Sequence, residues 1–197
     1  MAPTSFDQYQ VGALATAIGT GELAVIYEAV GLVGEASEVA EIALAELTGT
    51  PVDSALVGEL GAVCWYAAAL TAALGLPLSA VTGTDDVEEF AADARSAESL
   101  AALGLGAAAL ELTVACGRLL ETVKKAARGD DGPRTLPLTL SAARTATIIE
   151  LVATVLARVA GIAEQSGATL ADALEANAAK LARRRANDTI TGDGSAR

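Results

Sequence analysis

Long apolar stretches interrupted by glycine, proline and acidic turns run through this sequence, and no segment shows sustained alternation of apolar and polar residues. Alternation is typical of a half-buried strand, whereas apolar residues recurring every three or four positions indicate an amphipathic helix. The pattern therefore predicts an all-α protein, a helical bundle without a sheet. Helices are expected over Phe6–Ile18, Glu22–Leu47, Asp53–Leu74, Leu100–Arg128, Thr139–Gln165 and Thr169–Arg185.

Capping and breaking residues flank these segments. Ser5 precedes the first predicted helix, and Asp53 or Ser54 opens the third, as expected of N-cap side chains. Gly49 follows the second helix and Gly75 the third. The helix boundaries are therefore predicted by local chemistry as well as by periodicity.

The stretch TGTDDVEEFAADARSAES carries six acidic residues and one base, Arg95. Such a charge-rich segment between apolar stretches is typical of a solvated connector with helical tendency. We therefore divide the chain into a first half over 1–84, an acidic connector over 85–99, a second half over 100–186 and a polar tail over 187–197.

Composition limits the chemistry. Hydrophobic residues make up 52% of the 197 residues but aromatic residues only 3%, so the core is built from small side chains. Histidine is absent, which excludes Ser-His-Asp and Cys-His catalysis and histidine metal sites. Cys64 and Cys116 stand alone in apolar segments and are interpreted as free core thiols in a reducing compartment.

The charge balance argues against a nucleic-acid partner. A net charge of -12 disfavours a nucleic-acid-binding surface, because the phosphate backbone binds to net-basic patches. An acidic protein that handles phosphates needs a metal ion or a local basic cluster. The N-terminal sequence shows no basic region followed by an apolar run, so a cytoplasmic protein is expected.

Residues 60–84 contain no charged side chain and are long enough to cross a bilayer. The stretch is mostly alanine and glycine, contains Pro77, ends in an acidic cluster and has no flanking lysine or arginine to set its orientation. A helix buried in the bundle explains this composition better, and no membrane partner is expected.

Glu35, Glu38 and Glu41 recur at intervals of three in the second predicted helix, and Glu59 lies early in the third. Residues at i and i+3 share a helix face, so Glu35 and Glu38 can point at one spot. These acids either line a solvated face or point into the bundle as ligands of a divalent cation. Their small and apolar neighbours favour the second interpretation.

The two halves follow a similar order. A helix containing acids is followed by a turn and by an apolar helix, which begins near Glu59 in the first half and near Glu150 in the second. Neither helical hairpin can bury its apolar face alone, so pairing of two repeats predicts a bundle.

At GLVGEASEVAE and ELGAVCWYAAAL the chain resembles the MazG-type all-α NTP pyrophosphohydrolases, whose pattern reads roughly GLxGEAGEVAE and then ELGDVLWYLAAL. The resemblance extends to KKAARGD, EANAAKLARR and the tail DTITGDG. An isolated ExxE carries little information, but its glycine and apolar context is far more specific.

The resemblance implies hydrolysis of a nucleoside triphosphate to a monophosphate and pyrophosphate, as house-cleaning of the nucleotide pool. It implies Mg²⁺ or Mn²⁺ held by Glu35, Glu38 and Glu59, with Glu38 as the candidate catalytic residue. Carboxylate oxygens are the ligands that Mg²⁺ prefers, together with water and substrate phosphates.

The chain departs from the family pattern at one ligand, because the aspartate expected three residues after Glu59 is Ala62. In the second half Ala115 and Arg118 stand where Glu35 and Glu38 stand in the first, so no metal is expected there. By resemblance, Asn177 and Lys180 approach the nucleotide. These assignments predict one composite site, with a metal side from the first half and a nucleotide side from the second.

Several of the remaining candidates also have a structural explanation. Trp65 either stacks on the base or fills the core, and Lys180 and Arg184 either contact phosphate or compensate a helix dipole. Lys124, Lys125 and Arg128 share this ambiguity at another helix end.

Two other functions compete with the pyrophosphohydrolase. The first is a catalytically degenerate MazG-fold protein with a nucleotide-binding or regulatory role, and Ala62 favours it. The second is a structural or membrane-associated helical protein, and residues 60–84 favour it. A homodimer is also considered, since an uncovered apolar helix face would favour one.

Overall fold

The computed structural model describes residues 3–17, 21–52, 55–97 and 104–187. Within these ranges the regular elements are helical, apart from one isolated bridge between Ser5 and Asp86, so the prediction of an all-α protein is confirmed. The helices are α1 (Phe6–Leu14), α2 (Ala24–Leu47), α3 (Ala55–Ala73), α4 (Ser79–Thr82), α5 (Val87–Ala97), α6 (Leu105–Ala127), α7 (Ala142–Gln165) and α8 (Leu170–Ala186), with a 3₁₀ turn η1 (Gly21–Leu23) before α2.

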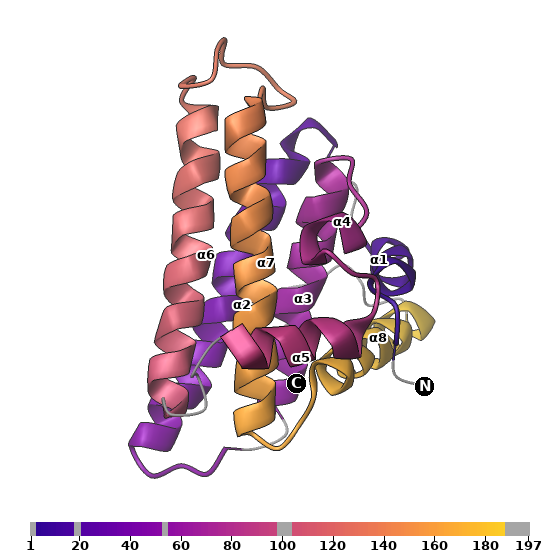
Figure 1. Ribbon diagram of the computed structural model, residues 1–197, viewed down its shortest axis with the longest axis vertical. Coiled ribbons are helices and arrows are strands. Elements are labelled where there is room, and N and C mark those ends of the chain that lie inside the picture. The colour runs from indigo at the N-terminus through magenta and orange to yellow at the C-terminus, as the bar shows by residue number, and fades with distance from the viewer. Residues whose placement is uncertain (1–2, 18–20, 53–54, 98–103, 188–197) are drawn as a thin grey trace.

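Four long helices form the bundle. Helices α6 and α7 stand side by side as a hairpin, and α2 and α3 form a second hairpin behind them (Figure 1). Helix α2 packs on α3 and α6, and α7 packs on α6 and α3. Two hairpins thus pack against each other, whereas the division of the chain into two repeats of one MazG-like unit stays a prediction.

Helix boundaries follow the capping chemistry. Ser5 caps α1 by accepting a hydrogen bond from the Gln8 amide, and Ser141 caps α7 in the same way. Thr169 and Asp172 form a capping box at the start of α8. The predicted first helix extends beyond Leu14, where α1 ends, and the proposed caps Asp53 and Ser54 lie outside the described residues.

The core depends on small side chains, as the composition indicated. Helix α3 is buried on nearly every side, from Leu60 to Cys64 and again from Ala67 to Thr71. A helix that is apolar all round is typical of this central position. Cys64 and Cys116 are both buried and free, and burial raises the pKa of each thiol to about 12.

Two of the described helices, α3 and α7, are long and apolar enough to cross a membrane by length and composition. Most of α3 is buried inside the protein, and core helices of globular proteins pass the same test. These two helices are therefore weak evidence for a membrane span.

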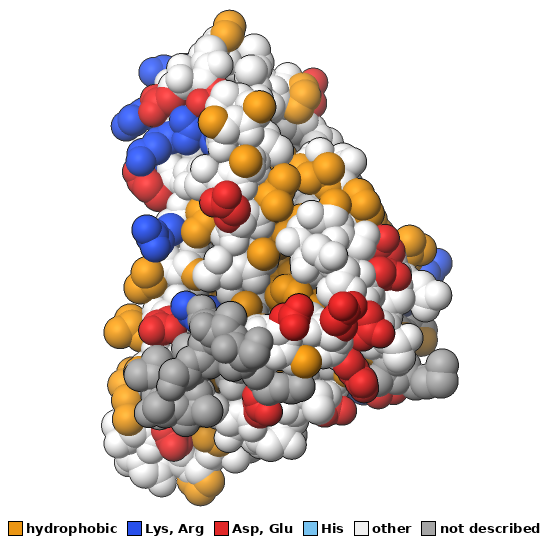
Figure 2. Space-filling view, in the orientation of Figure 1, with side chains coloured by type: hydrophobic (Ala, Val, Ile, Leu, Met, Phe, Trp, Pro, Cys, Tyr) orange, Lys and Arg blue, Asp and Glu red, His pale blue; other side chains and the backbone are white. Residues whose placement is uncertain are grey.

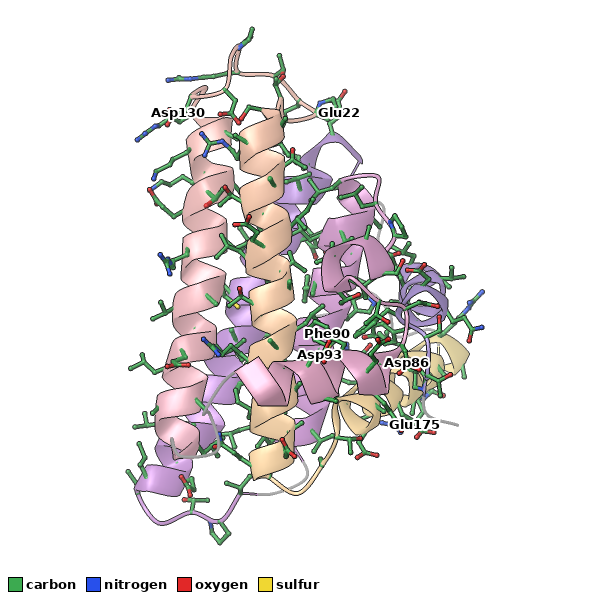
Figure 3. All side chains as sticks on the ribbon, viewed as in Figure 1. Glu22, Asp86, Phe90, Asp93, Asp130 and Glu175 are labelled. Carbon is green, nitrogen blue, oxygen red and sulfur yellow. The ribbon has the colours of Figure 1, made fainter. Side chains whose placement is uncertain are left out.

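The acidic segment is part of the packed structure. Val87, Phe90 and Ala91 on α5 are buried, and α5 packs across α7 and α8. Figure 3 shows Phe90 on the bundle side of α5, where its ring meets Phe6 edge-on with centroids 5.4 Å apart. The expected solvated connector is helical, but the apolar residues between its acids give it a buried face.

Asp85 joins this segment to the N-terminus. Its carboxylate accepts hydrogen bonds from the Ser5 hydroxyl at 2.6 Å and from the Asp7 amide at 2.8 Å. These contacts fix the start of α1, which lies beside α3 and α8.

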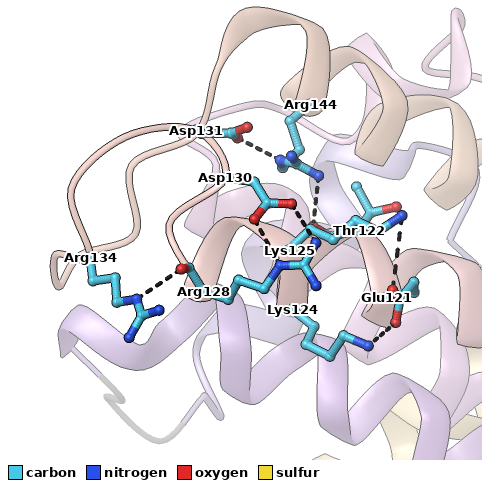
Figure 4. Close-up of polar contacts among 9 residues, drawn as sticks. All are labelled: Glu121, Thr122, Lys124, Lys125, Arg128, Asp130, Asp131, Arg134 and Arg144. Atoms are coloured by element: carbon cyan, nitrogen blue, oxygen red, sulfur yellow. Dashed lines mark hydrogen bonds and ion pairs between the residues drawn. The ribbon is translucent and has the colours of Figure 1, made fainter.

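Basic side chains gather at the tip of the α6–α7 hairpin (Figure 2), where acidic residues pair with them. Arg128 binds Asp130 at 2.8 Å, Arg144 binds Asp131 at 2.5 Å, and Lys124 pairs with Glu121 (Figure 4). This charge network ties the hairpin together, which favours the structural interpretation of the basic residues here.

Helices α3 and α8 approach each other closely at Gly61. A Cβ atom at Gly61 would lie 2.3 Å from the Ala173 carbonyl oxygen and 2.8 Å from the Cβ of Asn177, both on α8. Only a residue without a side chain allows the two backbones to pack this closely. Gly61 therefore sets the position of α8, the element that carries Asn177 and Lys180.

We expect Gly61→Ala to destabilise the fold by about 1–3 kcal/mol, because overpacking forces backbone shifts. Gly58→Ala is the matched control, since a Cβ at Gly58 in the same helix meets nothing within 4 Å. The control is expected to gain up to about 1 kcal/mol from helix propensity. Urea unfolding of both variants checks this pair, and equal stability would contradict the contact.

Candidate functional site

Three carboxylates converge between α2 and α3. Ligand oxygens of Glu35, Glu38 and Glu59 all lie within 4.8 Å of one another. Glu35 and Glu59 are partly buried and Glu38 is exposed, so the cluster opens to solvent on one side. The residues predicted to point at one spot are thus brought together. Glu41 is exposed and does not join them.

A pocket adjoins this cluster and contains the residues predicted for the nucleotide side. It is lined by Thr16, Tyr27, Glu35, Ala62, Trp65, Tyr66, Asn177, Lys180, Leu181 and Arg184. Its walls come from α2 and α3 in the first half and from α8 in the second. Helix α8 packs mainly on α3, and this packing makes a composite pocket possible.

Ala62 stands where the resemblance predicts an aspartate. It is buried, lines the pocket and lies one helical turn after Glu59 on α3. No carboxylate extends from this position, so the pocket side of the cluster stays open. An ion held by the three glutamates would leave coordination positions there for water or for a ligand.

Lys180 reaches the cluster from α8. Its Nζ lies 3.7 Å from Oε2 of Glu59, an ion-pair distance that is too long for a hydrogen bond. The same Oε2 is buried and has no hydrogen-bond partner. We therefore regard the contact as a charge interaction that leaves this oxygen with free coordinating capacity.

The carboxylates perturb one another. Burial raises the pKa of Glu35 to about 7, and the charges of Glu38 and Glu59 push it in the same direction, whereas Lys180 and Arg184 oppose the shift. Like charges held this close cost folding free energy unless a proton or a cation compensates them. A cation bound at the cluster would relieve this repulsion.

Aromatic side chains form another wall of the pocket. The Tyr66 ring packs over Gly31, where a Cβ atom would lie 2.0 Å from the ring carbon Cε1. Trp65 meets Tyr66 edge-on with ring centroids 4.8 Å apart. The Trp65 indole donates hydrogen bonds to the Ala13 carbonyl at 3.1 Å and to the Thr16 hydroxyl at 3.2 Å. These contacts hold the indole at the wall.

Asn177 is 3% exposed and is connected to α1. The Tyr9 hydroxyl donates to Oδ1 of Asn177 at 3.1 Å, and the Gly61 carbonyl oxygen lies 3.4 Å from the same hydroxyl. Burial, with a smaller contribution from Cys64, raises the pKa of Tyr9 well above its usual value, so the hydroxyl keeps the proton that it donates.

Glu28 is a second unusual carboxylate on α2. It is 4% exposed, and its Oε2 has no hydrogen-bond partner. Burial raises the pKa of Glu28 to about 7. Burial also raises the pKa of Tyr66 to about 12, with smaller contributions from Tyr27, Glu35 and Glu28. Glu28 therefore lies close behind the aromatic wall, two helical turns before Glu35.

The second half contains no equivalent cluster among the residues that the structure describes. Ala115 is buried in the core and Arg118 is exposed on α6. That a single metal site per chain lies in the first half stays a prediction.

Tyr9, Thr16, Tyr27 and Glu28 were not singled out from the sequence. Glu28 had a usable signal, since residues 28, 31, 35 and 38 follow the 3-4-3 spacing of one helix face. Tyr9 had no comparable signal, because its contact with Asn177 joins residues 168 positions apart.

Comparison of the chain with models of known protein families, with curated proteins and with solved structures finds no match.

We expect Glu28→Gln to change how stability depends on pH. Between pH 4.5 and about 7 the folded protein keeps Glu28 protonated while the unfolded chain ionises it, so the stability of the wild type falls as pH rises. The full shift corresponds to about 3 kcal/mol. Glutamine removes this penalty, so the variant is expected to match the wild type near pH 4.5 and to exceed it by about 2–3 kcal/mol at pH 8.

Urea unfolding at several pH values measures this difference. Glu41→Gln, an exposed change in the same helix, is the control and should follow the wild type. A Glu28→Gln advantage that is the same at pH 4.5 and pH 8 would contradict the assignment.

Proposed function

We propose that this chain is a metal-dependent nucleoside triphosphate pyrophosphohydrolase that converts NTP to NMP and pyrophosphate in the cytoplasm, as house-cleaning of the nucleotide pool. One observation carries the proposal. A single pocket is lined by Glu35 of the carboxylate cluster, by two basic side chains and by an aromatic wall, which suit a cation, phosphates and a base. The resemblance at GLVGEASEVAE and ELGAVCWYAAAL points to the same chemistry.

The donor set of the cluster fits Mg²⁺ or Mn²⁺. Glu35, Glu38 and Glu59 offer only hard oxygen ligands, and Glu59 has a buried oxygen without a hydrogen bond. Adjacent ligands of an octahedral Mg²⁺ lie about 3 Å apart and opposite ligands about 4.2 Å, so three atoms within 4.8 Å of one another would draw closer by side-chain rotation to share one ion. When bound, the ion supplies charge neutralisation at the phosphates and lowers the pKa of a bound water.

Lys180 and Arg184 supply the positive charge that phosphates need. Both line the pocket, one helical turn apart on α8, and the charge of each acts on Glu35. A helix-end role alone does not explain why Lys180 reaches toward Glu59. We assign these two side chains to the triphosphate, with Lys180 moving from Glu59 to a phosphate oxygen.

The nucleoside is assigned to the wall formed by Trp65, Tyr66 and Asn177. Aromatic faces stack on bases, and the amide of a buried asparagine fixes orientation by hydrogen bonding. Trp65 thus has a structural role through α1 and exposes part of its ring to the pocket.

In the reaction a water oxygen attacks the α-phosphorus, and the bond from this phosphorus to the oxygen that bridges it to the β-phosphorus breaks. Pyrophosphate leaves with the bonding electron pair, and the proton of the water passes to a carboxylate. Glu38 is exposed where Glu35 and Glu59 are partly buried, so water reaches it first, and we assign it as the proton acceptor.

The second candidate is a protein that binds nucleotides without hydrolysing them. Ala62 favours it, because loss of one metal ligand weakens metal binding or removes activity. Binding in the same pocket is common to both candidates, and turnover separates them.

Pyrophosphate release from canonical and modified nucleoside triphosphates, with Mg²⁺ or Mn²⁺, tests the proposal. We expect metal-dependent turnover that falls at least about 100-fold in Glu38→Gln, as for loss of a catalytic group. Glu41→Gln, one turn away and outside the cluster, is the control and should keep wild-type turnover.

The variant Ala62→Asp separates the two candidates. Turnover in the wild type that needs Glu38 supports the enzyme with three carboxylates. An inactive wild type that gains turnover with Ala62→Asp would identify a binding protein. If a double variant that carries both Asn177→Ala and Lys180→Ala keeps wild-type turnover and nucleotide affinity, the composite site is refuted.

A further inference from the structure

We propose that Tyr9 is a positioning residue, which holds the Asn177 side chain so that its amide NH₂ group is presented to the pocket as a hydrogen-bond donor. The ligand is therefore expected to place an acceptor oxygen or nitrogen at this point. Identifying that ligand as a nucleotide rests on the proposed function, whereas the orientation of Asn177 does not.

The hydrogen-bonding capacity of the two side chains defines the orientation. An asparagine side chain has one acceptor oxygen and two N–H donors, and a tyrosine hydroxyl has one proton. The Tyr9 hydroxyl lies 3.1 Å from Oδ1 of Asn177 and 3.4 Å from the Gly61 carbonyl oxygen, and the shorter contact directs its single proton to Oδ1. None of the described residues accepts a hydrogen bond from Nδ2 of Asn177, although this side chain lines the pocket.

Packing alone gives no reason for a polar pair at this place. The other buried residues of α8 are Leu170, Ala173 and Leu174, and Tyr9 shares its buried face with Phe6 and Ala13. An apolar pair of similar size would fill the same space without desolvating polar atoms. This donor has no protein partner among the described residues and lines the pocket, so a ligand can use it.

The surroundings leave Asn177 little freedom to turn. Its Cβ lies close to Gly61, and Tyr9 is 4% exposed and packed on α3. Helix α1 also holds Trp65 through Ala13, so one short helix supports two walls of the pocket. Preorganised polar groups lose less free energy on binding than mobile ones.

Selective labelling tests the orientation directly, because the chain contains only two asparagines, Asn177 and Asn187. With ¹⁵N-asparagine the spectrum shows two side-chain NH₂ pairs, and exposed Asn187 serves as the internal reference. We expect Tyr9→Phe to move the Asn177 pair toward the Asn187 position and to speed its exchange with solvent. An Asn177 pair that is unchanged in Tyr9→Phe would overturn the proposal.

Binding measurements test what the donor is for. The probes are α,β-methylene analogues of the canonical nucleoside triphosphates with Mg²⁺, measured by calorimetry, so no turnover is needed. We expect Tyr9→Phe to weaken binding about tenfold, the loss for about 1.4 kcal/mol. Asn177→Asp keeps the acceptor for Tyr9 but removes the donor, and should weaken binding at least as much.

Thr71→Val is the matched control. It removes a fully buried hydroxyl on α3 that donates a hydrogen bond to the Ala67 carbonyl and does not line the pocket. It should keep wild-type affinity. Wild-type affinity in Asn177→Asp would overturn the ligand role of the amide. If the wild type binds none of the analogues, the proposed function fails, and the amide resonances still decide whether Tyr9 positions Asn177.

Discussion

The close approach of α3 and α8 at Gly61 is the constraint on which the site depends. The backbone carbonyl of Ala173 occupies the space that a side chain at Gly61 would need. This contact brings Asn177 and Lys180, from the end of the chain, against Ala62 and Glu59 near its beginning.

The site is stabilised by the rest of the protein and does not stabilise itself. Glu28 and Glu35 both have pKa values raised to about 7, mainly because burial disfavours their charged forms. Each therefore costs folding free energy once ionised. The compensation comes from the closely packed small residues of α2 and α3 and from paired charges at the far end of the α6–α7 hairpin, such as Arg144 with Asp131.

Local patterns predicted the helices well and tertiary contacts poorly. The end of α2 at Leu47 and the cap of α1 at Ser5 could be predicted because they depend on neighbouring residues. The spacing along one helix predicted that Glu35 and Glu38 lie together. The prediction that Glu59 joins them depended on the family resemblance. The buried face of α5 was missed because its acidic residues outweigh Val87, Phe90 and Ala91 in composition, although these three share one helix face.

The two halves of the chain carry different parts of the pocket, and electrostatics gives a reason for the division. Three carboxylates on α2 and α3 create a negative centre, and a basic side chain on the same helices would pair with them permanently. Lys180 instead reaches the cluster from a separate helix, and it stays at 3.7 Å from Glu59. A cation held at this distance can exchange one anionic partner for another. The proposed function, in which one pocket accepts both a metal ion and a polyanion, would use such an exchangeable charge, and α8 supplies it from outside the α2–α3 hairpin.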